Sequence, residues 1–128
     1  MGKKAILIVD HGSKRPEAND LLAAVAEMVQ GLSGWEIVRY AHMELAEPTI
    51  QQAFEACVGA GASEVVVHPY FLSPGEHSKQ DIPRMVAEVA SRFPGVNFVV
   101  TEPLGLHPKI GEVILDRVAG SSEFKTSR

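Results

Sequence analysis

Four apolar runs with the character of β-strands alternate along the chain with four segments of helical periodicity. The strand-like runs lie at 5–9, at 35–43, from Val65 onward and at 96–100. The helical segments begin near Pro16, Pro48 and Pro108 and directly after His77. Strict alternation of this kind predicts a parallel sheet with right-handed crossovers and helices on both faces. We therefore expect a three-layer α/β fold, flavodoxin-like, whose four-stranded parallel sheet has the strand order 2-1-3-4.

The length and composition are those of one globular domain. The chain has 128 residues, of which 45% are hydrophobic and 22% are charged, and a domain of this size buries most of its apolar surface without disulfides. We expect a single α/β domain over residues 1–119 and a flexible polar tail over 120–128. The one cysteine, Cys57, excludes an internal disulfide and a cysteine-based metal site within one chain. We interpret it as a small buried hydrophobic residue, with a reactive thiol as the alternative.

Charge and hydropathy argue against two classes of partner. The formal net charge is -4, whereas a general nucleic-acid-binding protein presents a basic face. No stretch approaches the roughly 20 apolar residues of a membrane span. The apolar run after Lys4 is shorter than the hydrophobic region of a signal peptide. We expect a cytoplasmic protein that binds neither nucleic acid nor membranes.

Three side chains with metal-binding chemistry follow three successive strands. His11, Glu44 and His77 lie at equal intervals of 33 residues, about one βα unit apart. In open α/β sheets, ligands bind outside the carboxyl ends of the strands, at the point where the strand order reverses. The three strands are neighbours in the order 2-1-3-4, so we expect these side chains to converge there.

Two imidazoles and one carboxylate suit first-row divalent metals such as Fe, Co, Ni or Zn. Such a set leaves coordination positions open, as a catalytic metal site requires. The sequence contains no HExxH zinc motif, no phosphate-binding P-loop and no GxGxxG dinucleotide motif. Histidines at strand exits also hydrogen-bond to loop backbone, so a structural role stays open for each of the two.

Several other polar residues allow both a functional and a structural interpretation. His42 could lie beside Glu44, and Asp10 could orient an imidazole as an outer carboxylate. A structural role is the alternative for both, and His68 and His107 are interpreted as a structural histidine and a helix cap. Four cations near the same edge could meet the carboxylates of an anionic ligand or be solvated surface charges: Lys14, Arg15, Lys79 and Arg84.

Three stretches of the chain carry a family resemblance. They are Asp10-His11-Gly12-Ser13-Lys14 with Pro16-Glu17-Ala18-Asn19, then Glu44-Leu45-Ala46-Glu47-Pro48, then the segment from Pro69 through Phe71-Leu72-Ser73-Pro74-Gly75-Glu76-His77 to Asp81-Ile82-Pro83. With them the chain resembles the short-form class II tetrapyrrole chelatases, the CbiX and SirB type of sirohydrochlorin chelatase, over roughly residues 4–118. The sequence departs from the family pattern at Tyr70, where an aliphatic residue is common, and at His42, where an apolar residue is common.

The resemblance implies an enzyme that inserts Co²⁺ or Fe²⁺, or Ni²⁺ in one relative, into sirohydrochlorin on the way to cobalamin or sirohaem. It carries over His11 and His77 as the metal-binding and catalytic pair and Glu44 as the carboxylate. The divalent metal is then a substrate, and no permanent cofactor is expected. Long forms of the family contain two such halves, so the resemblance implies a homodimer with two open edges facing a cleft. The residues expected to bind the tetrapyrrole are Ser13, Lys14, Arg15, Phe71, Leu72, Ser73 and Gly75.

Two other functions fit parts of the pattern. A non-catalytic metal or tetrapyrrole carrier would use the same residues to hold its ligand. A receiver-like or flavodoxin-like signalling domain is disfavoured, because no acidic pair follows the first strand and no phosphate-binding loop is present. The sequence leaves open which metal is physiological, because His and carboxylate ligands accept several.

Overall fold

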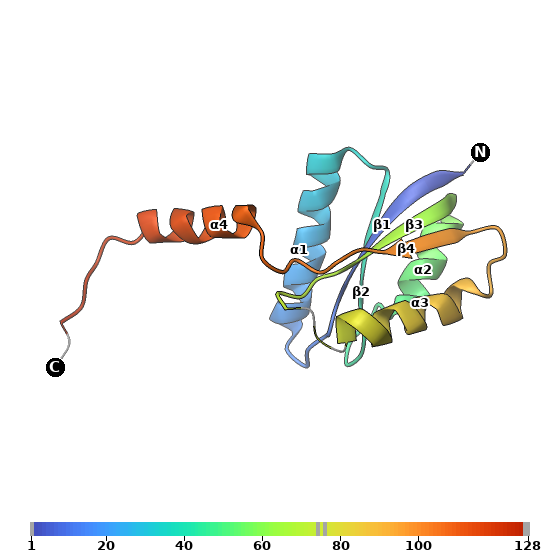
Figure 1. Cartoon of the computed structure of the whole chain (residues 1–128), viewed down its shortest axis with the longest axis horizontal. Coiled ribbons are helices and arrows are strands. Elements are labelled where there is room, and N and C mark those ends of the chain that lie inside the picture. The colour runs from blue at the N-terminus through green and yellow to red at the C-terminus, as the bar shows by residue number, and fades with distance from the viewer. Residues whose placement is uncertain (1, 74, 76, 127–128) are drawn as a thin grey trace.

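One sheet of four parallel strands lies at the centre of the molecule, in the order β2-β1-β3-β4 (Figure 1). The computed structural model describes residues 2–73, 75 and 77–126, and for His77 and Ser78 it describes the backbone alone. The predicted α/β class, parallel pairing and strand order are confirmed. The strands are β1 (Lys3–Asp10), β2 (Ile37–His42), β3 (Ala62–Pro69) and β4 (Asn97–Val100).

Three helices cover the sheet, and a fourth lies away from it. They are α1 (Pro16–Ser33), α2 (Ile50–Gly59), α3 (Ile82–Ala90), which follows a π-helical turn over His77–Asp81, and α4 (Pro108–Ala119). α1 lies on one face of the sheet, whereas α2 and α3 lie on the other (Figure 1).

The alternation of side chains along β1 divides the core into two clusters. Leu7 and Val9 are fully buried against the α2 and α3 side, together with Phe54 of α2. Ile8 points the opposite way and packs with Leu22 of α1. The strand is apolar on both faces because helices cover both faces, as in other parallel sheets.

Helix boundaries follow local capping rather than proline alone. α1 begins at Pro16 as predicted and ends at Ser33, and the next residue, Gly34, has a φ of 73°, the left-handed conformation that glycine adopts easily. The start expected at Pro48 is wrong by two residues. α2 begins at Ile50, because the Thr49 hydroxyl accepts a hydrogen bond from the backbone N–H of Gln52 and the Gln52 side chain accepts one from the Thr49 N–H.

The residue before α3 does not cap the helix. Asp81 occupies the residue before α3, but it has helical dihedral angles (φ −72°, ψ −44°) and its side chain makes no capping hydrogen bond. The π-helical turn before it runs directly into the helix, so α3 has no sharp start there.

Cys57 is fully buried between α2 and the sheet. Burial raises the pKa of its thiol to about 11, against a smaller opposing effect of Arg39. The interpretation of Cys57 as a small buried hydrophobic residue is confirmed. Among the described residues, no helix combines the length and hydropathy needed to cross a bilayer.

Candidate functional site

His11 and Glu44 meet at the carboxyl edge of the sheet. The His11 Nε2 atom lies 3.2 Å from the Glu44 Oε1 atom, and the side chains are 42% and 55% exposed. They come from different loops, one after β1 and one after β2. An imidazole and a carboxylate that contact each other and also face solvent are accessible to a metal ion or a substrate.

Backbone hydrogen bonds hold these two loops side by side beyond the ends of the strands. The Met43 N–H donates to the Asp10 carbonyl at 2.9 Å, and the Glu44 N–H donates to the His11 carbonyl at 3.1 Å. The pairing of β1 with β2 therefore continues into the loops. This continuation brings His11 next to Glu44, as the spacing along the chain predicted.

Gly12 makes this close approach possible. Its φ is +96°, and a Cβ atom added there would lie 1.9 Å from the carbonyl oxygen of Glu44 and 3.1 Å from the Cβ of His42. A side chain at this position would push the two loops apart. The glycine of the HGS motif thus has a steric reason as well as a conformational one.

Asp10 orients an imidazole, but the imidazole is that of His42. The His42 Nδ1 atom lies 2.6 Å from the Asp10 Oδ1 atom, and the His42 side chain is only 1% exposed. Its other ring nitrogen, Nε2, is buried and has no hydrogen-bond partner within the described residues. Asp10 and His42 are partners in the register of β1 and β2, so the pair ties the two strand ends directly beneath the His11 loop.

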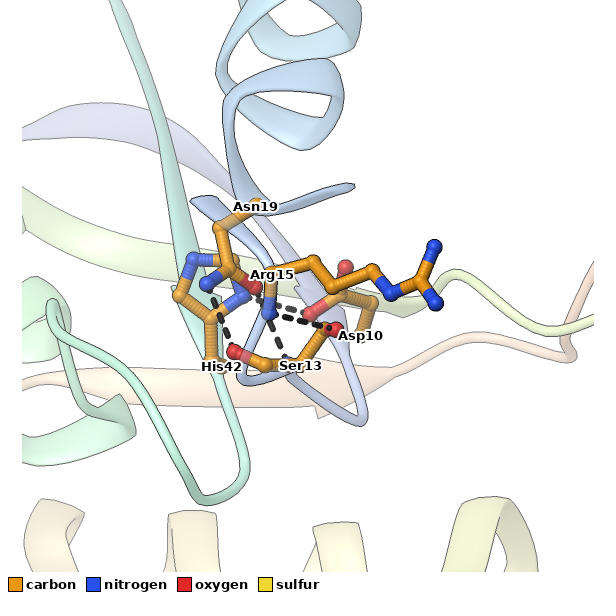
Figure 2. Close-up of polar contacts among 5 residues, drawn as sticks. All are labelled: Asp10, Ser13, Arg15, Asn19 and His42. Atoms are coloured by element: carbon orange, nitrogen blue, oxygen red, sulfur yellow. Dashed lines mark hydrogen bonds and ion pairs between the residues drawn. The ribbon is translucent and has the colours of Figure 1, made fainter. Parts of the chain in front are cut away.

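Asn19 of α1 fixes the loop that carries Ser13, Lys14 and Arg15. The Ser13 N–H donates to the Asn19 Oδ1 at 3.0 Å, and the Asn19 side-chain amide donates to the Ser13 carbonyl at 2.8 Å. The Arg15 N–H donates to the Ser13 hydroxyl. Figure 2 shows these contacts beside the Asp10–His42 pair, with the Arg15 guanidinium pointing away from them. Sequence reasoning missed this role of Asn19, although Asn19 stands in the quoted motif.

The loop after β3 supplies the other expected substrate residues. The Tyr70 N–H donates to the Val9 carbonyl at 2.7 Å, which continues the β1–β3 pairing to the same edge. Phe71 packs partly against the core, whereas Leu72 is 70% exposed. Ser73 and Gly75 are also exposed, and the Gly75 N–H donates to the Ser73 carbonyl.

His77 completes the expected triad, but its side chain lies outside the described residues, as do Pro74 and Glu76 entirely. The convergence of His77 on His11 and Glu44 therefore stays a prediction. Within the part of the chain that the structure describes, no group of three or more His, Cys, Asp or Glu side chains could hold a metal ion. His11 and Glu44 are the two predicted ligands that the described structure brings together.

The other histidines have the structural contacts expected of them. The His68 Nδ1 atom lies 2.9 Å from the Thr101 hydroxyl, and His107 caps α4 by accepting a hydrogen bond from the Lys109 N–H. Burial lowers the pKa of His68, against an opposing effect of the backbone at Glu102.

The four cations lie on exposed positions around this edge. Lys14 and Arg15 belong to the loop after β1, and Lys79 belongs to the π-helical turn. Arg84 forms an ion pair with Asp81 at 3.3 Å. A groove of about 360 Å³ lies at the β2 side, between α1 and α2, and is lined by neither His11 nor Glu44.

Comparison with known proteins identifies the family. The CbiX family model matches residues 5–121. The chain belongs to the CbiX family. Among the relatives, a chloroplastic sirohydrochlorin ferrochelatase of Arabidopsis thaliana is 48% identical over 113 residues, which cover 88% of this chain and 50% of the relative. A sirohydrochlorin cobaltochelatase of Methanopyrus kandleri is 31% identical and matches 89% of this chain and 94% of the relative.

Solved structures agree with this membership in the CbiX family. The sirohydrochlorin chelatase SirB from Bacillus subtilis subspecies spizizenii, in complex with cobalt, superimposes with a TM-score of 0.85 at 35% identity. The match covers 91% of this chain and 50% of SirB. This chain thus spans about half the length of SirB and of the Arabidopsis relative, and nearly the whole length of the Methanopyrus relative.

Proposed function

We propose that this chain inserts a divalent metal ion, Co²⁺ or Fe²⁺, into sirohydrochlorin. The observation that carries the proposal is the contact of His11 with Glu44 at the carboxyl edge of a CbiX-family domain. The relatives named above support the reaction, because their names include both a cobaltochelatase and a ferrochelatase of sirohydrochlorin. The metal is a substrate of this reaction, and no permanent cofactor is proposed.

The chemistry of the edge fits metal insertion. The reaction removes two protons from pyrrole nitrogens while the metal ion leaves its water or protein ligands. Neutral imidazole can bind a metal ion or accept a proton, and a carboxylate can do the same. We propose that His11 and Glu44, together with His77, position the metal ion and accept the protons.

Cations and polar loop groups supply the binding of the tetrapyrrole in this proposal. Lys14 and Arg15 are exposed on a loop that Asn19 holds rigidly, so their charges lie near the edge. Cationic side chains form charge-assisted hydrogen bonds with carboxylates, and sirohydrochlorin carries many of them. Phe71, Leu72, Ser73 and Gly75 would form the opposite wall of the binding site.

We propose further that the active form is a homodimer. The single chain covers half of SirB. At its carboxyl edge, the side chains of His11 and Glu44 are partly exposed to solvent. A second copy facing that edge would enclose the tetrapyrrole between two sites. The proposed location is the cytoplasm, whereas the name of the Arabidopsis relative states a chloroplast for that protein.

Turnover separates an enzyme from a carrier. Purified chain at low concentration is mixed with an excess of sirohydrochlorin and Co²⁺ or Fe²⁺, and the absorption spectrum of the macrocycle is followed against a protein-free control. The proposal expects many equivalents of metallated product for each chain. Conversion that stops at one equivalent or fewer would support the carrier instead.

A further inference from the structure

Helix α4 exposes an apolar stripe that none of the described residues of the single chain covers. No residue of α4 is buried, and Val113, Ile114 and Val118 are 54%, 58% and 61% exposed. These residues lie on one side of the helix, whereas Glu112 and Asp116 lie on the other. In Figure 1, α4 lies well away from the sheet and the other three helices. An exposed apolar stripe of this kind marks a surface that packs against another part of a protein.

The sheet has an uncovered face of matching character. Ile6 and Ile8 of β1 pack on the α1 side. Ile6 pairs with Val66 of β3, which pairs with Val99 of β4, and residues paired across parallel strands point to the same face. Val99 is 55% exposed. On this side α1 packs over β1 and β2, and a groove of about 230 Å³ runs over β3 and β4, lined by residues that include Trp35, Val66 and Val99.

α1 supplies an apolar wall to the same groove. Leu21, Met28 and Leu32 are 62%, 56% and 83% exposed and share one flank of α1. At about 100° per residue, this flank is opposite to that of Ala23 and Gln30, which line the groove toward β2 and α2. The exposed flank therefore faces β3 and β4. The sheet surface around Val66 and Val99 and the exposed flank of α1 together form a position large enough for one helix, which we call the vacant position.

The dimensions of α4 suit the vacant position. Its 12 residues span about 18 Å, and the 8 residues of β3 span about 26 Å. In a parallel sheet both faces are normally covered by helices. α4 covers neither face of its own sheet, and the vacant position is the part of the sheet that α1, α2 and α3 do not cover.

The connection to α4 directs the helix away from its own sheet. After β4, the Thr101 N–H donates to the Val67 carbonyl at 2.8 Å and the Leu104 N–H donates to the Phe71 carbonyl at 3.0 Å. These bonds hold the connection along the exit of β3, so the chain continues in the direction of the strands. α4 consequently lies beyond the carboxyl edge (Figure 1), which is the edge that faces the second copy in the homodimer proposed above.

We propose that α4 of each copy docks in the vacant position of the other copy, so that the two chains exchange their last helices. The inference rests on the proposed homodimer but not on the metal chemistry. The stripe of Val113, Ile114 and Val118 would pack on Val66 and Val99 of the partner, beside Leu21 and Met28. The exchange would join the two chains at the same edge that carries His11 and Glu44.

Cysteine cross-linking tests which chain receives the helix. One chain carries Val99→Cys in the vacant position and another carries Ile114→Cys on the apolar stripe, while the fully buried Cys57 is kept. The two variants are refolded together and oxidised with diamide. A covalent heterodimer that forms only in the mixture supports the exchange. The matched control replaces Ile114→Cys with Ala119→Cys, on the polar side of α4, and should give no cross-link.

The double variant Val99→Cys/Ile114→Cys distinguishes the alternatives within one chain. The exchange predicts a disulfide-linked dimer on a non-reducing gel. A monomer with an internal disulfide would mean that α4 folds back on its own sheet, and the absence of any disulfide would mean that α4 does not dock there. Either of these two results would overturn the proposal.

Molar mass measured by light scattering separates failure of the exchange from failure of the homodimer. The wild-type chain, whose mass is 13.8 kDa, is expected at twice that mass. Val113→Glu should halve the mass, and Ala119→Glu should leave it unchanged. A wild-type dimer that Val113→Glu does not dissociate would overturn the exchange but keep the homodimer, whereas a wild-type monomer would overturn both.

Discussion

The side chains of Asp10 and His42 join the carboxyl ends of β1 and β2 through a contact of 2.6 Å. His42 is fully buried; its Nδ1 atom contacts Asp10, and its Nε2 atom has no hydrogen-bond partner among the described residues. The pair lies under the loop that carries His11, so it supports the candidate site without facing solvent.

Replacing Asp10 alone should lower the free energy of unfolding more than replacing both Asp10 and His42. Asp10→Ala leaves a buried imidazole without its partner, and we expect a loss of about 1.5–3 kcal/mol in the free energy of unfolding. Asp10→Ala/His42→Leu replaces both polar groups with apolar ones and should recover part of that loss. Urea denaturation of Asp10→Ala, His42→Leu and the double variant measures the three losses. A double variant whose loss equals the sum of the two single losses would contradict a direct coupling.

Gly12→Ala should separate the His11 and Glu44 loops. The added Cβ would overlap the Glu44 carbonyl, and the φ of +96° is unfavourable for alanine. Gly34→Ala is a matched control, since Gly34 also has a positive φ but no atom within 4 Å of the added Cβ. The control should lose about 1–2 kcal/mol of unfolding free energy, the cost of a left-handed residue. Gly12→Ala should lose more, and equal losses would show that the contact with Glu44 is unimportant.

Stability should fall at acidic pH partly because of His68. Burial lowers the pKa of His68 in the folded chain. Below the ordinary histidine pKa of about 6.5, the unfolded chain then binds more protons, so the free energy of unfolding decreases as pH falls through the folded pKa. His68→Gln keeps a polar group beside Thr101 and should flatten this dependence. Denaturation at several pH values between 5 and 8 measures this dependence. If the free energy of unfolding changes with pH equally in wild type and His68→Gln, the assignment to His68 is refuted.

The thiol of Cys57 should be inert in the folded chain. Burial raises its pKa to about 11, so at pH 8 only on the order of one thiol in 1,000 is thiolate, the reactive form. Native protein should react very slowly with a chromogenic disulfide reagent, and protein unfolded in urea should react quickly. Equal rates in the two states would contradict the burial of Cys57.

The alternation of strands and helices was predictable from sequence because several local signals agreed. The apolar runs, the prolines near helix starts and the equal spacing of strand exits all indicated one βα repeat. The strand order 2-1-3-4 was expected for a flavodoxin-like sheet rather than derived from these signals, and it is the order observed. The same spacing predicted the meeting of His11 and Glu44, because the parallel pairing of β1 and β2 continues into their loops.

Other features depend on contacts that no local pattern contains. The partner of Asp10 is set by the register of β1 against β2, which alternation within one strand cannot give. The start of α2 is set by Thr49 and Gln52 rather than by Pro48. The helical pattern of α4 predicted a helix at Pro108 correctly, but its position relative to the sheet depends on the hydrogen bonds of Thr101 and Leu104.

The initial rate of metal insertion in edge variants tests the account most directly. Wild-type chain, His11→Ala, Glu44→Gln and Glu47→Gln are compared with sirohydrochlorin and Co²⁺, after subtraction of the uncatalysed rate. Glu47 is a matched control, because it lies on the same loop as Glu44 but contacts Gln52 instead. We predict that His11→Ala lowers the rate by about 10²–10⁴-fold, that Glu44→Gln lowers it too, and that Glu47→Gln leaves it unchanged. A His11→Ala protein that is folded and inserts metal at the wild-type rate would contradict the account.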